Sequence, residues 1–260
     1  MKHKPLHLLA GIVAIAGLFS CSPQGPYNAT SADARQGESA THRSAPAERP
    51  GLATGWGNEK VSTLTGQSFV RASASPKGTD VIYYNDKQGF EAMAGRVSRV
   101  EAMQTAAGAL VEWGVKGRSG FLSTVKEGYS GRRLVAGEAN GTYTIVVRNR
   151  SKSTLEIVAS VDGLDVMDGK PASFSKRGYL VNPGTTLEID GFRTSENTVA
   201  AFKFSSVSNS YANLRHGDTR NVGVLGIAVF TQKGVNPWTW MPAEINRREQ
   251  ARPFAEAPGR

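Results

Sequence analysis

The chain has 260 residues, with 31 Lys and Arg, 22 Asp and Glu, one cysteine and four histidines, and its formal net charge is +9. Only His216 lies beyond residue 50, so a zinc site made of His and Cys cannot be assembled in the region expected to fold. The basic residues are scattered without a run of five or more, which indicates a solvated surface and argues against nucleic acid as a partner. No cofactor is expected.

The chain begins with a basic segment that contains Lys2 and Lys4, followed by an apolar stretch from Leu6 to Phe19. A basic segment before an apolar run of this length is typical of a secretory signal, because a membrane span needs about 20 apolar residues. We therefore expect residues 1–20 to act as a signal peptide for export.

The residues Leu18-Phe19-Ser20-Cys21 resemble the lipobox of bacterial lipoproteins, although Phe19 stands where that pattern has a small residue. The resemblance implies that Cys21 carries a thioether-linked diacylglycerol and an amide-linked acyl chain such as palmitate, which together anchor the protein to a membrane. The residue after the cysteine is Ser22 and not Asp, which resembles the signal that sorts bacterial lipoproteins to the outer membrane. The expected location is the cell envelope, with the outer membrane favoured and its face left open. An ordinary signal peptide with an incidental cysteine is the alternative.

The segment 21–50 is rich in Ser, Ala, Pro, Gly, Arg and Gln, and Tyr27 is its only large apolar residue. Such a segment buries too little apolar surface to offset its ordering entropy, so it is predicted to be a disordered tether. Residues 51–245 have a normal length for one domain, and residues 246–260 are expected to be a flexible tail.

The first part of this domain predicts two strands and one helix. Ser68–Ala74 and Asp80–Asp86 have strand composition. Within 85–106, apolar residues recur every three or four positions up to Met103, and Asp86 is a candidate N-cap, which favours one amphipathic helix. Gly89 and Gly95 weaken this helix and make a shorter one an equal alternative.

The second part predicts mainly strands. Thr142–Arg150 and Thr154–Asp162 are interpreted as a hairpin joined by the polar turn 151–153. Further strands are expected from Thr186, Thr198 and Asn221. Short strands at nearly regular spacing favour an all-β fold with minor helix, a single antiparallel β-sandwich with one short helix.

Three aspartates, Asp162, Asp165 and Asp168, lie three residues apart. An EF-hand-like loop from Asp162 would need oxygen ligands where Leu164 and Val166 stand, so calcium remains only the weaker alternative. Asp-Gly pairs are strong turn signals, so Asp162 and Asp168 are predicted to shape turns around an inward-facing Leu164 and Val166. Asp190-Gly191 is interpreted as a further turn of this kind.

Trp238 and Trp240 lie two residues apart between prolines and could hold a sugar or enter a membrane interface. Closing the end of a sandwich core is the more frequent role of such a pair. Loops that contain Arg193 and Tyr211 complete the candidate ligand-binding surface. The alternative is a carbohydrate-active hydrolase, which needs two carboxylates on either side of the scissile bond. Its candidate residues are Glu156, Asp162, Asp165, Asp168, Glu188 and Asp190.

Five stretches resemble a recurring set in bacterial envelope proteins for which no activity is known: RPGLATGWGNE, YYND, SVDGLDVMDGKPASFSKRGYLV, IDGFRTSENTVAAFKFSSVSNSYA and RNVGVLGIAVF. The resemblance supports one domain and gives no catalytic residue. We therefore expect a lipid-anchored cell-envelope protein, not an enzyme, with a binding or structural β-sandwich domain. The expected partners are the membrane, through the anchor, and an envelope protein or polysaccharide.

Overall fold

The computed structural model describes residues 49–64, 66–238 and 242–251. Several of the predicted features lie outside the described residues: the signal peptide, Cys21, nearly all of the tether, Trp240 and most of the tail.

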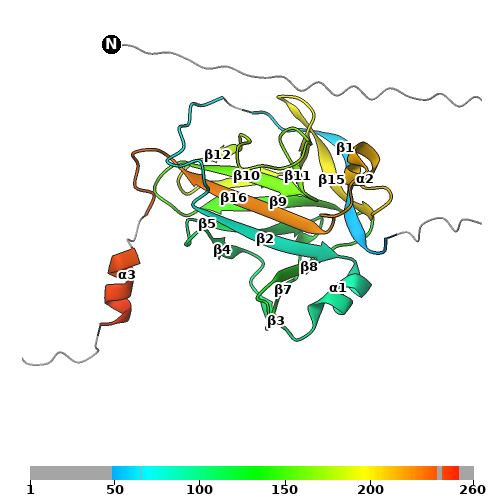
Figure 1. Ribbon diagram of the computed structural model, residues 1–260, viewed down its shortest axis with the longest axis horizontal. Helices are drawn as coiled ribbons and strands as arrows, with labels where there is room; N and C mark the ends of the chain where they lie inside the picture. The colour runs from blue at the N-terminus through cyan, green and yellow to red at the C-terminus, as the bar shows by residue number, and fades with distance from the viewer. Residues whose placement is uncertain (1–48, 65, 239–241, 252–260) are drawn as a thin grey trace, which may run out of the picture. The chain divides into compact units, whose positions relative to one another are not determined.

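Two layers of strands make up the domain, an antiparallel β9 sheet and a mixed β10 sheet (Figure 1). The β9 sheet has the order β1 (Leu52–Val61), β15 (Thr198–Ser206), β9 (Thr142–Asn149), β5 (Val111–Gly117) and β4 (Gln104–Ala106). Three short strands join it: β13 (Thr186–Ile189) on β9, β14 (Gly191–Arg193) on β15, and β6 (Gly120–Phe121) on β5.

The β10 sheet has the order β11 (Leu164–Asp165), β10 (Leu155–Val161), β16 (Val224–Thr231), β2 (Gly78–Asn85), β8 (Arg133–Ala136), β7 (Thr124–Glu127) and β3 (Val97–Val100). β12 (Tyr179–Val181) pairs with β10. The sandwich-like, mostly β fold is thus confirmed. Within the described ranges only β2 and β8 pair in parallel, which departs from the predicted antiparallel order. This pairing is possible because a long connection, α1 and β3 to β7, separates the two strands along the chain.

The core lies between the sheets. Along β15, Phe202 and Phe204 are buried, while Lys203 between them is more exposed, as expected for side chains that alternate across a strand. Trp113 of β5 is fully buried, and its indole N–H donates to Asp80 of β2 at 2.7 Å, which joins the two sheets by a polar contact.

The predicted helix is present in its shorter form. α1 spans Lys87–Ala94, and the Asp86 side chain caps it by accepting from the Gly89 N–H at 2.7 Å. Gly95 follows with φ +48°, and Val97–Val100 then form β3 against β7 instead of a further helical turn. The long helix prediction is wrong because these valines satisfy a strand pairing.

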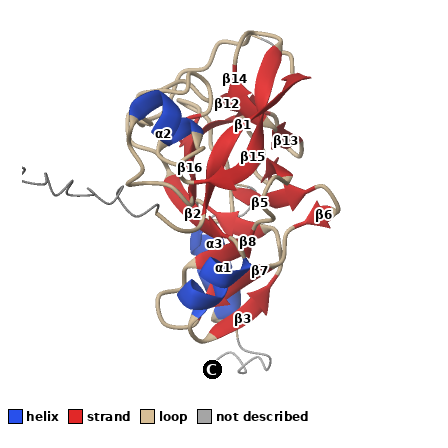
Figure 2. Ribbon diagram, turned by 90° about the vertical axis from the view of Figure 1, so that its right-hand side faces the viewer, coloured by secondary structure: helices blue, strands red, loops and turns tan. Residues whose placement is uncertain are grey.

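Two helices were not predicted, α2 (Tyr211–His216) and α3 (Pro242–Glu249). α2 begins at Ser210, whose hydroxyl accepts from the Asn213 N–H, and ends at Gly217 with φ +63°. Figure 2 shows α2 beside β1. The predicted boundary between domain and tail at 245 falls inside α3.

The predicted hairpin of 142–150 and 154–162 is wrong, although both strands exist. β9 and β10 belong to different sheets, so residues 150–154 carry the chain from one layer to the other. The buried Asn149 side chain fixes this crossing: its amide donates to the carbonyls of Ser153 and Val181, and its oxygen accepts from Ser151.

The strand predicted at Ser68–Ala74 is also absent. These residues belong to a loop over the outer face of the β10 sheet and make only the isolated bridge between Arg71 and Gln232. Strand composition alone misled here, because Phe69 packs on Val158 and Phe230 from outside the sheet. The strand predicted at Asp80–Asp86 is confirmed as β2. No helix in the described part of the chain is long and apolar enough to cross a membrane.

Candidate functional site

The segment of three aspartates forms turns at two of the predicted points. Asp162 and Gly163 have φ +54° and +79° and join β10 to β11, where Val161 pairs with Leu164. Two successive positive φ values are typical of a hairpin turn with mirror-image geometry. Gly169 has φ +64° in the second turn, which returns the chain to an isolated bridge between Leu164 and Pro171. Leu164 and Val166 are buried, as predicted.

Asp190-Gly191 is not a hairpin turn, which corrects the third prediction. Asp190 lies between β13, which pairs with β9, and β14, which pairs with β15. A Cβ atom at Gly191 would lie 2.0 Å from the Ala200 carbonyl oxygen, so this glycine permits close backbone approach rather than a turn.

Asp162 lies inside the sandwich with 4% of its surface exposed. Its carboxylate accepts from the Tyr84 hydroxyl at 2.6 Å, the Thr54 N–H at 2.7 Å and the Gly223 N–H at 2.9 Å. Burial raises the pKa of Asp162 to about 6, against the opposing effect of these donors. The side chain therefore holds strands together and is inaccessible to a substrate.

Asp165 and Asp168 serve the second turn. Asp165 is fully buried, accepts from the Met167 and Asp168 N–H groups, and leaves one oxygen without a partner among the described residues. Burial raises the pKa of Asp165 to about 6. Asp168 instead forms an ion pair with Lys176. The described residues contain no group of three His, Cys, Asp or Glu side chains placed to hold a metal ion.

The predicted ligand-binding residues have different surroundings. Arg193 is bound by its own domain: its guanidinium donates to the Ser62 carbonyl at 2.7 Å and to the Tyr179 hydroxyl at 3.1 Å. Trp238 is partly buried against the core and lies 5.7 Å from the Lys77 ammonium. Trp240 lies outside the described residues. Tyr211, the remaining predicted ligand-binding residue, belongs to an exposed aromatic surface.

This surface, the α2 patch, consists of Trp56, Tyr211, Leu214 and Arg215, which line a shallow hollow of about 490 Å³. The rings of Trp56 and Tyr211 lie 4.7 Å apart, and Phe192 supports both from beneath. Trp56 is 48% exposed and Leu214 is 72% exposed. The sequence did not predict this surface, because the position of Trp56 on an edge strand depends on the sheet order.

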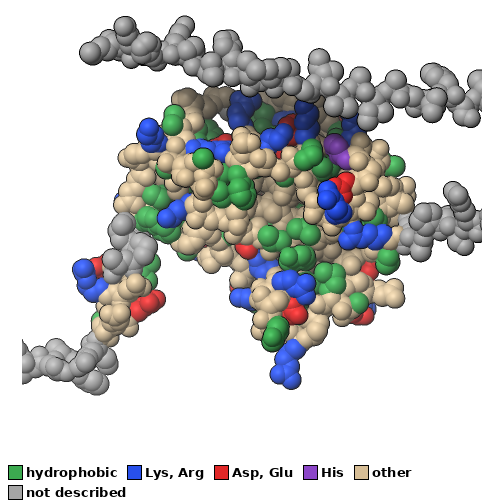
Figure 3. Space-filling view, in the orientation of Figure 1, with side chains coloured by type: hydrophobic (Ala, Val, Ile, Leu, Met, Phe, Trp, Pro, Cys, Tyr) green, Lys and Arg blue, Asp and Glu red, His purple; other side chains and the backbone are tan. Residues whose placement is uncertain are grey.

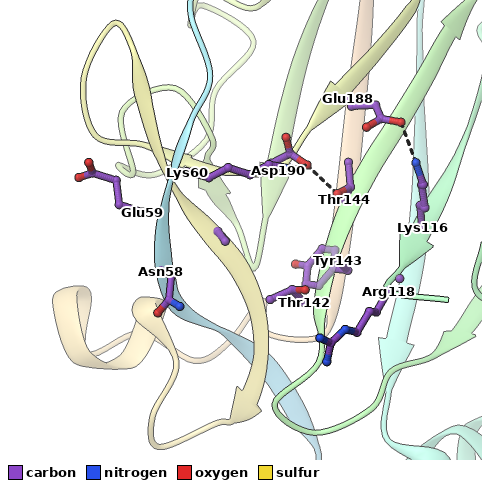
Figure 4. A pocket seen from close by; sticks show the side chains of 12 residues that line it. Asn58, Glu59, Lys60, Lys116, Arg118, Thr142, Tyr143, Thr144, Glu188 and Asp190 are labelled. Carbon is purple, nitrogen blue, oxygen red and sulfur yellow. Dashed lines mark hydrogen bonds and ion pairs between the residues drawn. The ribbon is translucent and has the colours of Figure 1, made fainter. Parts of the chain in front are cut away.

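A second hollow, of about 430 Å³, lies where β9 and β15 separate, and we name it the fork hollow (Figure 4). β9 and β15 pair only at Tyr143 with Phe202 and at Thr142 with Lys203. Beyond these pairs, β13 continues along β9 and β14 along β15, so the two strands diverge at Asp190. The divergence leaves a polar depression between β1 and β5.

The fork hollow is lined by equal numbers of cationic and anionic side chains: Lys60, Lys116, Arg118, Glu59, Glu188 and Asp190. Lys60 pairs with Asp190 at 2.8 Å and Lys116 with Glu188 at 3.1 Å. Asp190 also accepts from the Thr144 hydroxyl at 2.7 Å, as Figure 4 shows. Arg118 and Glu59 make no side-chain hydrogen bond or ion pair with the described residues, so both are available to a ligand.

Of the six carboxylates considered for hydrolysis, the structure brings only Glu188 and Asp190 into one hollow. Glu156 is buried and accepts from Arg71 at 2.6 Å. His216 lies exposed at the end of α2, with Nε2 2.8 Å from the Gly169 carbonyl oxygen. The sequence did not predict the fork hollow, since it depends on residues from five strands.

Across the face in Figure 3, Lys and Arg side chains are spread singly or in small groups, several of them beside acidic side chains. A search with family models, one of curated proteins and one of solved structures each found no match to this chain.

Proposed function

We propose that this protein is a lipid-anchored module of the cell envelope that binds polysaccharide in the fork hollow without cleaving it. The observation that carries the proposal is the lining of the hollow, which offers three cationic donors and three carboxylate acceptors with no net charge. Sugar hydroxyl groups both donate and accept hydrogen bonds, so they match such a mixed surface better than a polyanion does.

The size and exposure of the hollow agree with this ligand class. Its volume of about 430 Å³ lies in the range of roughly 300–1,000 Å³ that is usual for small-ligand sites. The hollow is open on the sheet surface, so a long chain could cross it while one or two units make contact. The lipobox resemblance at Cys21 supports an envelope location for that polymer.

Retention of the purified full chain on isolated envelope polysaccharide tests the proposal. Arg118→Ala removes a guanidinium and Glu59→Gln removes a negative charge, and neither group forms a hydrogen bond or ion pair with the described residues. Each change should weaken retention about tenfold, because hydrogen bonds to charged groups contribute roughly 1.5–3 kcal/mol. Arg96→Ala is the matched control, since Arg96 is exposed between α1 and β3. Equal retention of Arg118→Ala, Glu59→Gln and Arg96→Ala would remove the fork hollow from the site.

The anchor has a test of its own. Cys21→Ala should abolish acyl labelling and release the protein from membranes. A parent protein that pellets with membranes yet takes up no acyl label would overturn the lipid anchor while leaving polysaccharide binding untouched.

A carbohydrate-active hydrolase is the second candidate, favoured by the two carboxylates Glu188 and Asp190 in one hollow. Binding is preferred because each carboxylate already holds a lysine, whereas hydrolysis needs one acid to carry a proton to the leaving oxygen. Measuring glycan release from purified cell wall decides between them. Release that disappears in Glu188→Gln and Asp190→Asn would establish the hydrolase, and the absence of release from the parent would reject it.

A further inference from the structure

The α2 patch is a second surface that the proposed polysaccharide site does not use. It combines two apolar side chains, Trp56 and Leu214, with the cationic Arg215 on the exposed side of α2. Moving the apolar surface of an exposed Trp or Leu side chain out of water is favourable. An aromatic ring with a polar edge is suited to the interface between lipid headgroups and acyl chains. An exposed patch of this kind marks an interaction surface.

The described part of the chain enters the domain beside this patch. Arg49, at the start of the described domain, donates from its guanidinium to the Thr219 carbonyl in the loop that follows α2. The chain therefore enters the domain beside α2. The proposed anchor at Cys21 is therefore joined to the domain on its α2 side.

Charge around the patch also suits a lipid surface. Arg215 makes no side-chain hydrogen bond or ion pair with the described residues. The nearby carboxylate of Asp218 is neutralised by Arg220 at 2.7 Å, which leaves Arg49 and Arg215 as a cationic surplus. Cationic side chains near an anionic membrane are attracted within a Debye length.

We propose that the α2 patch docks on an anionic lipid surface, with the Trp56 and Leu214 side chains entering the headgroup region and Arg215 facing lipid phosphates. The inference rests on the proposed lipid anchor only for the side from which the membrane is approached. Docking of this kind turns the fork hollow, which is lined by Asn58, Glu59 and Lys60 further along β1, into a site with a fixed orientation toward the envelope polymer.

Vesicle binding by the full chain with Cys21→Ser separates docking from covalent anchoring. This protein should cosediment with vesicles of phosphatidylglycerol and phosphatidylethanolamine, bind vesicles of phosphatidylcholine weakly, and lose affinity as salt is raised. Leu214→Ala should lower the partition coefficient about tenfold and Arg215→Ala about fivefold. Arg118→Ala and Tyr129→Ala are the matched controls, because Arg118 lies in the fork hollow and Tyr129 is fully exposed on the β7–β8 turn.

A second measurement reports directly on contact between Trp56 and the lipid. Brominated lipids should quench the tryptophan emission of the Cys21→Ser chain, and Trp56→Phe should remove most of that quenching. Equal vesicle binding by Leu214→Ala and the parent, or no binding to anionic vesicles, would overturn the proposal. So would a loss of polysaccharide retention in Leu214→Ala with vesicle binding intact, since the patch would then be a sugar platform. Loss of polysaccharide retention in Arg118→Ala alone concerns the fork hollow and leaves docking unaffected.

Discussion

Asp162 shows how one residue can serve a turn and a core at the same time. Its positive φ starts the β10–β11 turn, and its carboxylate gathers donors from Thr54 on β1, Tyr84 on β2 and Gly223 before β16. Thr54 in turn bonds to the hydroxyls of Tyr84 and Tyr143, so the network reaches both sheets. A buried network of this kind specifies the strand arrangement because each member would be unsatisfied in another one.

The ionisation of Asp162 makes the stability of the protein depend on pH. Because its pKa in the folded state, about 6, is above the ordinary value of 3.8, the native state binds the proton more tightly than the unfolded chain. This contribution is fully present below about pH 4 and is lost as the pH rises to about 6, an effect on the order of 3 kcal/mol. In urea unfolding at a series of pH values, the parent should therefore lose stability relative to Asp162→Asn across that window.

Asp165 provides the control for that experiment. Its pKa is also raised to about 6, so Asp165→Asn should remove a separate part of the same slope. A stability difference between the parent and Asp162→Asn that stays constant from pH 4 to pH 7 would contradict the assignment.

The Asp-Gly dipeptide predicted a turn correctly at one position in the chain and wrongly at another. Asp162-Gly163 forms the expected turn because strand residues on both sides of it can pair locally. Asp190-Gly191 has the same local signal, but the strands on either side pair with β9 and β15. Nonlocal partners decide between these outcomes, and no short stretch of sequence contains them.

At the scale of elements, the loop 66–77 owes its position to Arg71. The guanidinium pairs with both oxygens of Glu156, at 2.6 and 3.0 Å, and lies 3.7 Å from the centre of the Phe230 ring. The same side chain donates to carbonyls of Phe174 and Lys176, so it also holds the loop before β12. One residue thus fastens two loops to the outer face of the β10 sheet.

Arg71→Ala should destabilise the protein by about 3 kcal/mol, because it leaves the mostly buried Glu156 carboxylate without its cation. Hydrogen exchange should accelerate at the Ala72 and Lys77 amides, which donate to the Thr231 and Val229 carbonyls of β16. Arg220→Ala is the control, since its partner Asp218 lies at the surface and the pair contributes little. Unchanged exchange at Ala72 and Lys77 would show that Arg71 does not hold the loop.

The elements themselves were predicted unevenly, for a physical reason. β2, β9, β10 and β16 have continuous apolar and β-branched composition and are present as expected. The residues after Gly95 carry a helical spacing of apolar side chains, yet they form β3, because pairing with β7 outweighs a weak local preference. The loop at 68–74 looks like a strand because its apolar residues cover a sheet from outside.

For the whole molecule, the crossing at residues 150–154 decides which strands face each other. Two strands joined by a short polar turn ordinarily form a hairpin, but here β9 and β10 enter opposite layers. The fork hollow follows from this arrangement, since β13 fills the place beside β9 that a hairpin partner would occupy. The sandwich class was therefore predictable from composition and spacing, whereas the site depended on the sheet order.

Asn149 stabilises this crossing and should be among the residues least tolerant of replacement. It is fully buried, donates to the Ser153 and Val181 carbonyls at 2.8 Å each, and accepts from the N–H and hydroxyl of Ser151, also at 2.8 Å. Asn149→Ala leaves these buried groups unpaired and should lower the free energy of unfolding by about 3 to 5 kcal/mol. Asn149→Asp should cost at least as much, because a carboxylate cannot donate to the two carbonyls.

Urea unfolding followed by tryptophan fluorescence and by far-ultraviolet circular dichroism checks this prediction. Since Trp113 of the β9 sheet bonds to Asp80 of the β10 sheet, both probes should report one transition with one midpoint, shifted to lower urea in both Asn149 variants. Asn58→Ala, on the exposed part of β1, should leave the midpoint unchanged. Separate transitions in the parent would mean that the sheets unfold independently, and an unshifted midpoint in Asn149→Ala would mean that the crossing is held by other contacts.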